Sequence, residues 1–497
     1  MFLARFNVTL HCRDRRRGVL FRGSWDSSTS TCIQAENKTL LTKESLKCSG
    51  LNPGSTIMRI PGLHLVGTFL VCCCALLCPT QAYSCHEGLQ DNDVEAWARR
   101  DYFYVGGQYV ETTLVCVLPS RRSHLCSIRL TTTFQPTSNT KSTYMTGQIY
   151  VERLEPMHVR HETPLVFIAG NGQTGTVSST HQPPCIANPL TPHQNWLNTP
   201  DNRPGWASFF LNAGYTVYLT DQVQRGRSAW LPGSSQQSLF SAETYSKQFT
   251  APQNFPSYPQ ANLHTQWPGS GLPGDSVFDA LYASQVPVQS NATLQASYNN
   301  ASYAALLDKV GPAIVVTHSQ GGPFGWKLAD ARPHLVKALV ALESEGPPFE
   351  SYAAAPFDPS YIRPAANPNR PFGLTLLPLA YEPPIGSDAS LLARKNISAP
   401  NANLSSCILQ AAPARKLANL SKVPVLFVTA EASYHAVYDH CTVAFLRQAG
   451  VEVEFLELGK VGVHGNGHFM FMELNNLVVA ERVHQWLGRF GGAVCLG

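Results

Sequence analysis

The sequence predicts an α/β protein with one central, mostly parallel sheet and helices on both of its faces. Short β-branched apolar runs recur from residue 164 onward, helical stretches separate them, and most of the runs are almost continuously apolar. Strands have this pattern when helices cover both faces of a parallel sheet. The chain has 497 residues, 44% of them hydrophobic, which is enough for a large buried core.

The expected elements alternate along the chain. Residues 101–113 and 147–154 alternate apolar and polar side chains as strands do, and Gly106-Gly107 indicates a turn. The strands expected downstream are Leu165–Ala169, Thr216–Thr220, Ala313–Thr317, Val336–Leu342, Val425–Thr429 and Val453–Leu458. The expected helices are Trp206–Ala213, Gly325–Arg332, Val437–Gln448 and Asn476–Leu487. This βαβ alternation predicts a doubly wound sheet.

Two long intervals interrupt the alternation. Residues 229–310 separate two expected strands and are rich in Gly, Pro, Gln, Asn and Ser, and residues 346–400 are rich in Pro. Excursions of this length in a compact domain usually have a function. We interpret residues 229–310 either as a cap over the active site or as a surface insertion. Residues 115–137 are irregular and also look inserted.

The charge of the chain is concentrated near its start. Residues 1–57 hold nine Lys/Arg and four Asp/Glu, a net of +5, so that 4 − 5 = −1 remains for the rest of the chain. A nearly neutral body gives no electrostatic reason to expect a nucleic acid or an anionic membrane as partner.

Residues 58–82 have the layout of a signal peptide. Met58-Arg59 is a short basic start, Leu63 to Cys78 is an apolar run, and Ala82 is a small residue suited to cleavage. We therefore expect a functional start at Met58, a non-native or disordered extension over 1–57, and a secreted domain over 83–497. The alternative is a membrane signal anchor with 1–57 in the cytoplasm.

Two further features agree with export. Asn-X-Ser/Thr sequons follow the signal at Asn291, Asn300, Asn396, Asn403 and Asn419. Seven cysteines also follow it, and most would pair in an oxidising compartment. An odd number leaves one unpaired, and the sequence does not identify it.

A candidate nucleophile lies where an apolar strand ends. Ser319 follows Val315–His318, is followed by Gln320-Gly321-Gly322, and precedes an expected helix. A tight strand–turn–helix of this kind exposes a serine hydroxyl, and small residues allow the strained turn. The motif is imperfect because Thr317 stands where G-x-S-x-G has its first glycine. The structural alternative is a simple helix N-cap.

A serine hydroxyl needs a base and an orienting carboxylate. His464 and His468 lie in a Gly-rich loop after the last expected strand; His468 fits better because the apolar stretch 469–472 follows it directly, and His464 is the structural alternative. Glu343, Glu431 and Glu345 each follow a strand, and the local pattern does not choose among them.

The same reading predicts an oxyanion hole, which requires two backbone N–H groups. One is expected from Gln320 and the other from Asn171 and Gly172, in the glycine-rich loop after the strand that begins at Leu165. That loop also matches G-x-G-x-x-G formally. A dinucleotide site fits poorly, because a loop rich in Thr, Ser and Pro follows it instead of a helix.

Taken in order, these segments resemble a small group of bacterial and fungal secreted α/β-hydrolase esterases with a Ser-His-Glu triad. The specific matches are the Asp-Gln…Arg-Gly-Arg-Ser segment, 221–228, and the Gly-Val-His-Gly-Asn-x-His segment, 462–468. The resemblance implies the α/β-hydrolase fold, the triad Ser319, His468 and Glu343, and an oxyanion hole from Gln320 and the Asn171-Gly172 region. Gln224 departs from the group, which favours glycine there.

The expected activity is hydrolysis of a small-molecule carboxylic ester through an acyl-enzyme, with no metal or organic cofactor. The alternatives are a catalytically inactive binding module of the same fold, or a peptidase or acyltransferase with the same triad. A haloalkane dehalogenase needs Asp where Ser319 stands. No stable membrane association is expected after signal cleavage. A homodimer is compatible with the sequence, which does not determine the oligomeric state.

Overall fold

A computed structural model describes residues 98–112, 141–175, 196–231, 234–350 and 370–490, and the backbone alone of 10–13 and 20–23. The chain divides into two units, Met1–Thr80 and Gln81–Gly497. In the first unit, β1 (Leu10–Arg13) and β2 (Leu20–Gly23) pair antiparallel. The expected signal segment, residues 58–82, lies outside the described residues.

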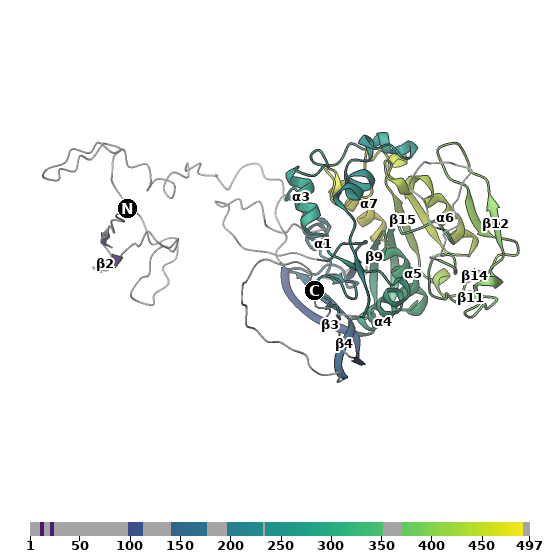
Figure 1. The fold of residues 1–497 in the computed structure, drawn as a ribbon, viewed down its shortest axis with the longest axis horizontal. Coiled ribbons are helices and arrows are strands. Elements are labelled where there is room, and N and C mark those ends of the chain that lie inside the picture. The colour runs from purple at the N-terminus through teal and green to yellow at the C-terminus, as the bar shows by residue number, and fades with distance from the viewer. Residues whose placement is uncertain are drawn as a thin grey trace, which may run out of the picture. The chain divides into compact units, whose positions relative to one another are not determined.

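An eight-stranded sheet forms the centre of the second unit (Figure 1). Its strands, in spatial order, are β16 (Val453–Glu457), β15 (Val425–Thr429), β10 (Val336–Leu342), β9 (Ala313–His318), β5 (Leu165–Ile168), β6 (Val217–Asp221), β4 (Ser142–Pro156) and β3 (Ala98–Thr112). The first six strands run parallel, and β4 and β3 are antiparallel to their neighbours. The predicted α/β-hydrolase fold is confirmed.

Helices cover both faces of this sheet, and alternate residues of one strand show it. Ala313 and Val315 of β9 point into the core on one face, whereas Ile314 and Val316 point into the core on the other. The first core is shared with α4 (Ala292–Val310), α5 (Gly321–Ala331) and α6 (Asp439–Gln448). The second is shared with α1 (Trp206–Asn212) and α7 (Asn476–Leu487). The continuously apolar strands therefore form as expected.

The shorter elements lie in the connections. The two-stranded pairs are β7 (Gln237–Ser238) with β8 (Val288–Gln289), β11 (Tyr381–Glu382) with β14 (Lys416–Leu417), and β12 (Arg394–Ile397) with β13 (Cys407–Gln410). The short helices α2 (Ala242–Tyr245) and α3 (Ser276–Ala283) lie in the interval 229–310. Its last part, α4, packs against β3, β4 and α5 and so covers the sheet.

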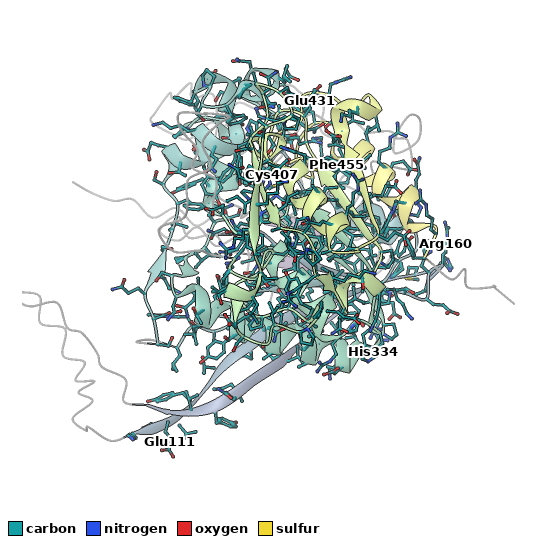
Figure 2. All side chains as sticks on the ribbon, turned by 90° about the vertical axis from the view of Figure 1, so that its right-hand side faces the viewer. Glu111, Arg160, His334, Cys407, Glu431 and Phe455 are labelled. Carbon is teal, nitrogen blue, oxygen red and sulfur yellow. A yellow bond between two sulfur atoms is a disulfide. The ribbon has the colours of Figure 1, made fainter. Side chains whose placement is uncertain are left out.

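The turn expected at Gly106-Gly107 is wrong. Both glycines lie inside β3, with φ of +71° and +82°, and the pairing of β3 with β4 continues on both sides of them. A Cβ on Gly106 would lie 2.8 Å from the Cα of Ser302 in α4. The glycine is therefore needed for the close approach of this helix to the strand. Beyond it the two strands extend away from the body, as Glu111 marks in Figure 2.

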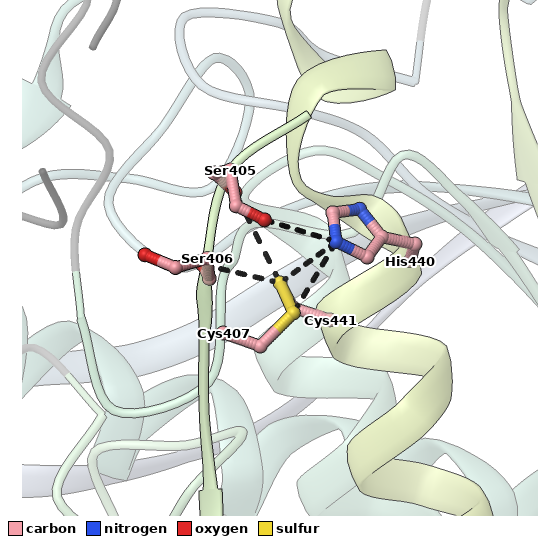
Figure 3. The surroundings of a disulfide bond; sticks show 5 residues. All are labelled: Ser405, Ser406, Cys407, His440 and Cys441. Atoms are coloured by element: carbon pink, nitrogen blue, oxygen red, sulfur yellow. Dashed lines mark hydrogen bonds between the residues drawn. A yellow bond between two sulfur atoms is a disulfide. The ribbon is translucent and has the colours of Figure 1, made fainter. Parts of the chain in front are cut away.

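Within the described residues, a disulfide joins Cys407 of β13 to Cys441 of α6, with the two Cα atoms 5.2 Å apart (Figure 3). The Nε2 atom of His440 lies 3.3 Å from the sulfur of Cys407 and 3.1 Å from the carbonyl oxygen of Ser405. The bond ties the β12–β13 pair to a helix of the main body. The other cysteines that follow the apolar run lie outside the described residues: Cys85, Cys116, Cys126, Cys185 and Cys495.

Candidate active site

Ser319 lies in a sharp turn between β9 and α5. Its φ is +52°, a strained backbone conformation for a residue with a side chain. A Cβ on Gly321 would lie 2.6 Å from the carbonyl oxygen of Ile168, so a glycine is required at this crossing. Thr317 fits at the imperfect motif position because Gly325 lies opposite: a Cβ on Gly325 would lie 2.6 Å from the Thr317 methyl group.

Glu343 and His468 meet in the interior. Glu343 directly follows β10, with φ of +43°, and His468 lies in the loop after β16. The Nδ1 atom of His468 lies 2.6 Å from Oε2 of Glu343, and both side chains are almost fully buried. Glu343 also accepts hydrogen bonds from the Ala430 N–H at 2.8 Å and the Ser433 hydroxyl at 2.7 Å. These contacts fix the carboxylate and orient the imidazole, leaving Nε2 for another partner.

Burial acts on both members of this pair. It lowers the pKa of His468 well below its usual value, and His318 and His435 lower it further. Burial also raises the pKa of Glu343 above its usual value. Both directions follow from one cause, because a buried site disfavours separated charges. The lowered pKa of His468 favours the neutral imidazole, the form that can accept a proton.

Aromatic rings enclose His468. The Phe249 ring stacks on it with centroids 5.2 Å apart, and the His435 ring stacks at 4.9 Å with the planes only 7° from parallel. His318, beside the serine, donates from Nε2 to the His468 carbonyl oxygen at 3.0 Å, and burial lowers its pKa to about 3. His318 is thus a packed neighbour that holds the backbone of the loop.

Ser319 and His468 open onto the same pocket, which has a volume of about 190 Å³. Its lining residues come from the sheet edge, from the loop after β5 and from the interval 229–310: Asn171, Gln173, Phe240, Gln248, Phe249, His318, Ser319, Gln320, Glu345, Tyr434, His468 and Phe469. Two of the three predicted oxyanion residues, Asn171 and Gln320, are among them. Gly172 is not: a Cβ there would lie 3.0 Å from the Tyr245 hydroxyl, and its carbonyl accepts the Val286 N–H.

The segment 221–228 supports the loop after β5. The fully buried Arg225 donates to the Gly170 carbonyl oxygen at 2.7 Å and to Oε1 of Gln320 at 2.7 Å, and so joins this loop to the residue after Ser319. Burial lowers the pKa of Arg225 to about 10. Gln224 has φ of +57°, the conformation that favours the glycine of the similar esterases. Its amide bonds Thr146 at 3.2 Å, which helps to hold it there.

The alternative residues lie elsewhere. Nδ1 of His464 lies 3.0 Å from Oε1 of Glu431, and this pair is at the surface, with 64% and 24% of the two side chains exposed. Glu345 lines the pocket and forms an ion pair with Arg370 at 2.9 Å. The structure therefore brings together His468 and Glu343, places His464 and Glu431 in a separate surface pair, and leaves Glu345 at the pocket with Arg370 as its partner.

Two buried histidine–carboxylate pairs were not anticipated from the sequence. His435 Nδ1 lies 3.0 Å from Oδ1 of Asp439, and burial lowers the pKa of His435 to about 4. His264 Nε2 lies 2.8 Å from Oε1 of Glu473. The four-residue spacing of His435 and Asp439 is a local signal that could have suggested the first pair. Nothing local connects His264 with Glu473, 209 positions later.

Among the described residues, two groups have the composition of a metal site: Cys407, His440 and Cys441, and Glu343, His435 and His468. The two sulfurs of the first group are bonded to each other. In the second, the Glu343 carboxylate bonds His468, and His435 bonds Asp439 and Tyr438. The donor atoms of both groups thus have partners without an ion. None of the described helices has the length and apolar character needed to span a membrane.

Comparisons with solved structures give several resemblances. "The Atomic Resolution Structure of a Novel Bacterial Esterase" is 20% identical, over 79% of this chain and 96% of that one, with a TM-score of 0.48. The peroxisomal α/β-hydrolase Lpx1 from Saccharomyces cerevisiae is 10% identical, over 80% and 91%, with a TM-score of 0.33. Naproxen esterase from Bacillus subtilis is 12% identical, over 81% and 100%, with a TM-score of 0.32.

Sequence comparison identifies the family to which the chain belongs. The chain matches no protein-family model. It is 47% identical over 344 residues to "Probable secreted lipase phiG" of Fungal sp. (strain ATCC 74256), covering 69% of this chain and 86% of that protein. The chain therefore belongs to the family of this fungal protein, within the α/β-hydrolases.

Proposed function

We propose that the protein is a secreted serine hydrolase that cleaves small carboxylic esters through an acyl-enzyme intermediate. One observation supports this most strongly: His468, whose ring contacts the buried Glu343, opens onto the same pocket as Ser319, which follows the neighbouring strand. Membership in the family of a protein named as a secreted lipase agrees with both the reaction and the export.

The proposed reaction has two steps. His468 Nε2 accepts the Ser319 proton while the hydroxyl oxygen attacks the ester carbonyl, and Glu343 stabilises the imidazolium that forms. Backbone N–H groups at Asn171 and Gln320 stabilise the oxyanion. The imidazolium returns its proton to the departing alcohol. Water, deprotonated by the same imidazole, then attacks the acyl carbon and releases the acid and free Ser319.

The first test is Ser319→Ala. Without the nucleophile, kcat for a short-chain aryl ester should fall by about 10⁴–10⁶, and the far-UV circular dichroism should not change, because the methyl group keeps the turn filled. The measurement is the steady-state rate of the purified enzyme. Turnover within tenfold of the wild type would refute the assignment. A wild-type protein that hydrolyses no ester would favour the inactive binding module.

A further inference from the structure

The pocket is closed on one side by a segment that the sequence left open to two interpretations. We call residues 234–291 the insertion; they lie between the segment after β6 and helix α4. Phe240, Gln248 and Phe249 of the insertion line the pocket, and Phe249 stacks directly on the ring of His468. The insertion is therefore part of the wall around the proposed general base.

Backbone hydrogen bonds attach the insertion to the segment that carries this base. We call residues 463–475 the histidine loop. The N–H groups of Thr265 and Gln266 both donate to the Gly465 carbonyl oxygen, at 3.0 and 3.2 Å. In return, the Leu474 N–H donates to the carbonyl oxygen of Gln266 at 2.9 Å. The insertion thus bonds the histidine loop on both sides of His468.

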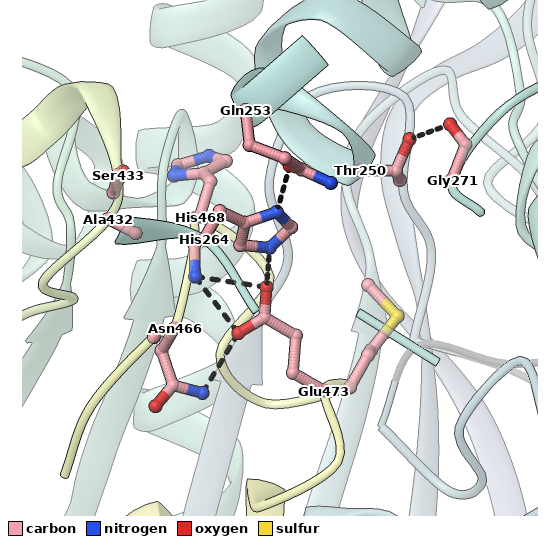
Figure 4. A network of polar contacts seen from close by, with 12 residues as sticks. Thr250, Gln253, His264, Gly271, Ala432, Ser433, Asn466, His468 and Glu473 are labelled. Carbon is pink, nitrogen blue, oxygen red and sulfur yellow. Dashed lines mark hydrogen bonds and ion pairs between the residues drawn. The ribbon is translucent and has the colours of Figure 1, made fainter. Parts of the chain in front are cut away.

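A buried histidine–carboxylate hydrogen bond strengthens this attachment (Figure 4). His264 of the insertion lies 2.8 Å from Glu473 of the histidine loop, and both side chains are fully buried. The other ring nitrogen of His264 lies 2.8 Å from Oε1 of Gln253, so the imidazole is fixed at both ends. Opening the insertion would separate this pair and remove one of the hydrogen bonds that the buried Glu473 carboxylate accepts, which is costly.

The same carboxylate holds the backbone next to His468. The Gly467 N–H donates to both oxygens of Glu473 at 3.0 Å, and the Asn466 amide donates at 2.8 Å. A Cβ on Gly467 would lie 2.9 Å from Nε2 of His264, so the backbone packs directly on that ring. Contacts therefore run without a break from the insertion to the residue before His468.

From this arrangement we infer that the insertion is a fixed wall and not a mobile lid, and that His264 and Glu473 are positioning residues for His468. The enzyme then acts on dissolved, short-chain esters and is not activated at a lipid–water interface. A lid that opened would pull on the histidine loop and displace the base. The pocket volume agrees: about 190 Å³ compares with a cavity of about 150 Å³ that holds one benzene ring. This inference rests on the proposed ester hydrolysis.

The substrate test compares dissolved and aggregated esters. Initial rates with tributyrin should saturate below its solubility limit and show no jump when droplets form. Among p-nitrophenyl esters, kcat/KM for the butyrate should exceed that for the palmitate by at least about tenfold. A rate jump at the solubility limit, or a preference for palmitate, would overturn the inference while leaving the proposed function intact. Absence of any ester hydrolysis would instead refute the proposed function.

The positioning role is tested with Glu473→Gln and His264→Gln. Each should lower kcat by about tenfold to a hundredfold with KM within about threefold, because a displaced base slows the chemical step more than binding. The double variant should be no slower than the slower single variant, since both act through one contact. The matched control is His464→Gln, in the same loop but in the exposed pair, and its kcat should be unchanged. Folded Glu473→Gln and His264→Gln proteins with wild-type kcat would refute the role.

Hydrogen exchange of the wild-type protein tests the inference without any substitution. Peptides covering 260–270 and 463–475 should be strongly protected, and equally so with and without a tributyrin emulsion. Faster exchange of both peptides in the emulsion would show that the insertion opens, and would overturn the inference.

Discussion

His464 and His468 lie in one loop and each contacts a glutamate, and the two pairs differ in their surroundings far more than in their geometry. The nitrogen–oxygen distance is 2.6 Å between His468 and Glu343 and 3.0 Å between His464 and Glu431. The first pair is buried and its histidine lines the same pocket as Ser319, whereas the His464 side chain is 64% exposed. An exposed pair is solvated and contributes little. Burial and access to the pocket, and not the contact itself, are what distinguish the proposed catalytic pair.

Substitution of the two histidines should give the largest contrast. His468→Asn removes the proposed base and should lower kcat by about 10⁴–10⁶. His464→Asn changes only a surface contact and should leave kcat within about twofold of the wild type. Steady-state kinetics with one aryl ester measures both. A large loss in the second variant, with the first still active, would reverse the assignment of the two pairs.

The two glutamates should differ by a smaller factor. Glu343→Gln keeps the shape of the side chain but removes the charge that stabilises the imidazolium, and should lower kcat by about 10⁴. Glu431→Gln should leave kcat nearly unchanged. The comparison needs matched thermal unfolding curves, because Glu343 also bonds Ser433 and Ala430. If only the Glu431 variant lost activity, the assignment of Glu343 as the carboxylate of the triad would be wrong.

The smallest expected effect is on pH dependence. Activity requires Nε2 of His468 to be unprotonated, and burial lowers the pKa of this imidazole below the ordinary 6.5. The blocking proton therefore binds only at a lower pH, and the acid limb of kcat/KM should have its midpoint below pH 6.5. A midpoint above pH 6.5 would contradict this environment. His464 lies in the surface pair and does not line the pocket, so its replacement should leave the profile unchanged.

The strands of the central sheet that lead to the proposed site could be predicted from the sequence. The strands that carry Ser319 and Glu343 are continuous apolar runs, and their ends fall within a residue of the prediction. Helix α4 was missed because the first part of its buried face is polar: Gln295, Asn299 and Ser302 are buried, and apolar residues are buried only from Tyr303 onward. Asn299 accepts the Val223 N–H at 3.0 Å, a pairing that no apolar period reveals.

The contacts between the insertion and the histidine loop could not be predicted, because they join residues that are far apart in the sequence. His264 meets Glu473 across 209 positions, and Phe249 reaches His468 from within a Gly- and Pro-rich interval. The choice among Glu343, Glu431 and Glu345 also depends on burial, since all three follow strands. The resemblance to the Ser-His-Glu esterases selected Glu343, the one that lies beside His468. The local sequence pattern identifies where strands end, but it does not show which of the residues that follow them are buried.

The most direct measurement is to identify the nucleophile covalently. An organophosphonate probe should add one phosphonyl group to the protein, and peptide mass spectrometry should locate it on Ser319. His464→Asn should be labelled at the wild-type rate, and His468→Asn far more slowly. An unmodified protein, or an adduct on another residue, would contradict the account.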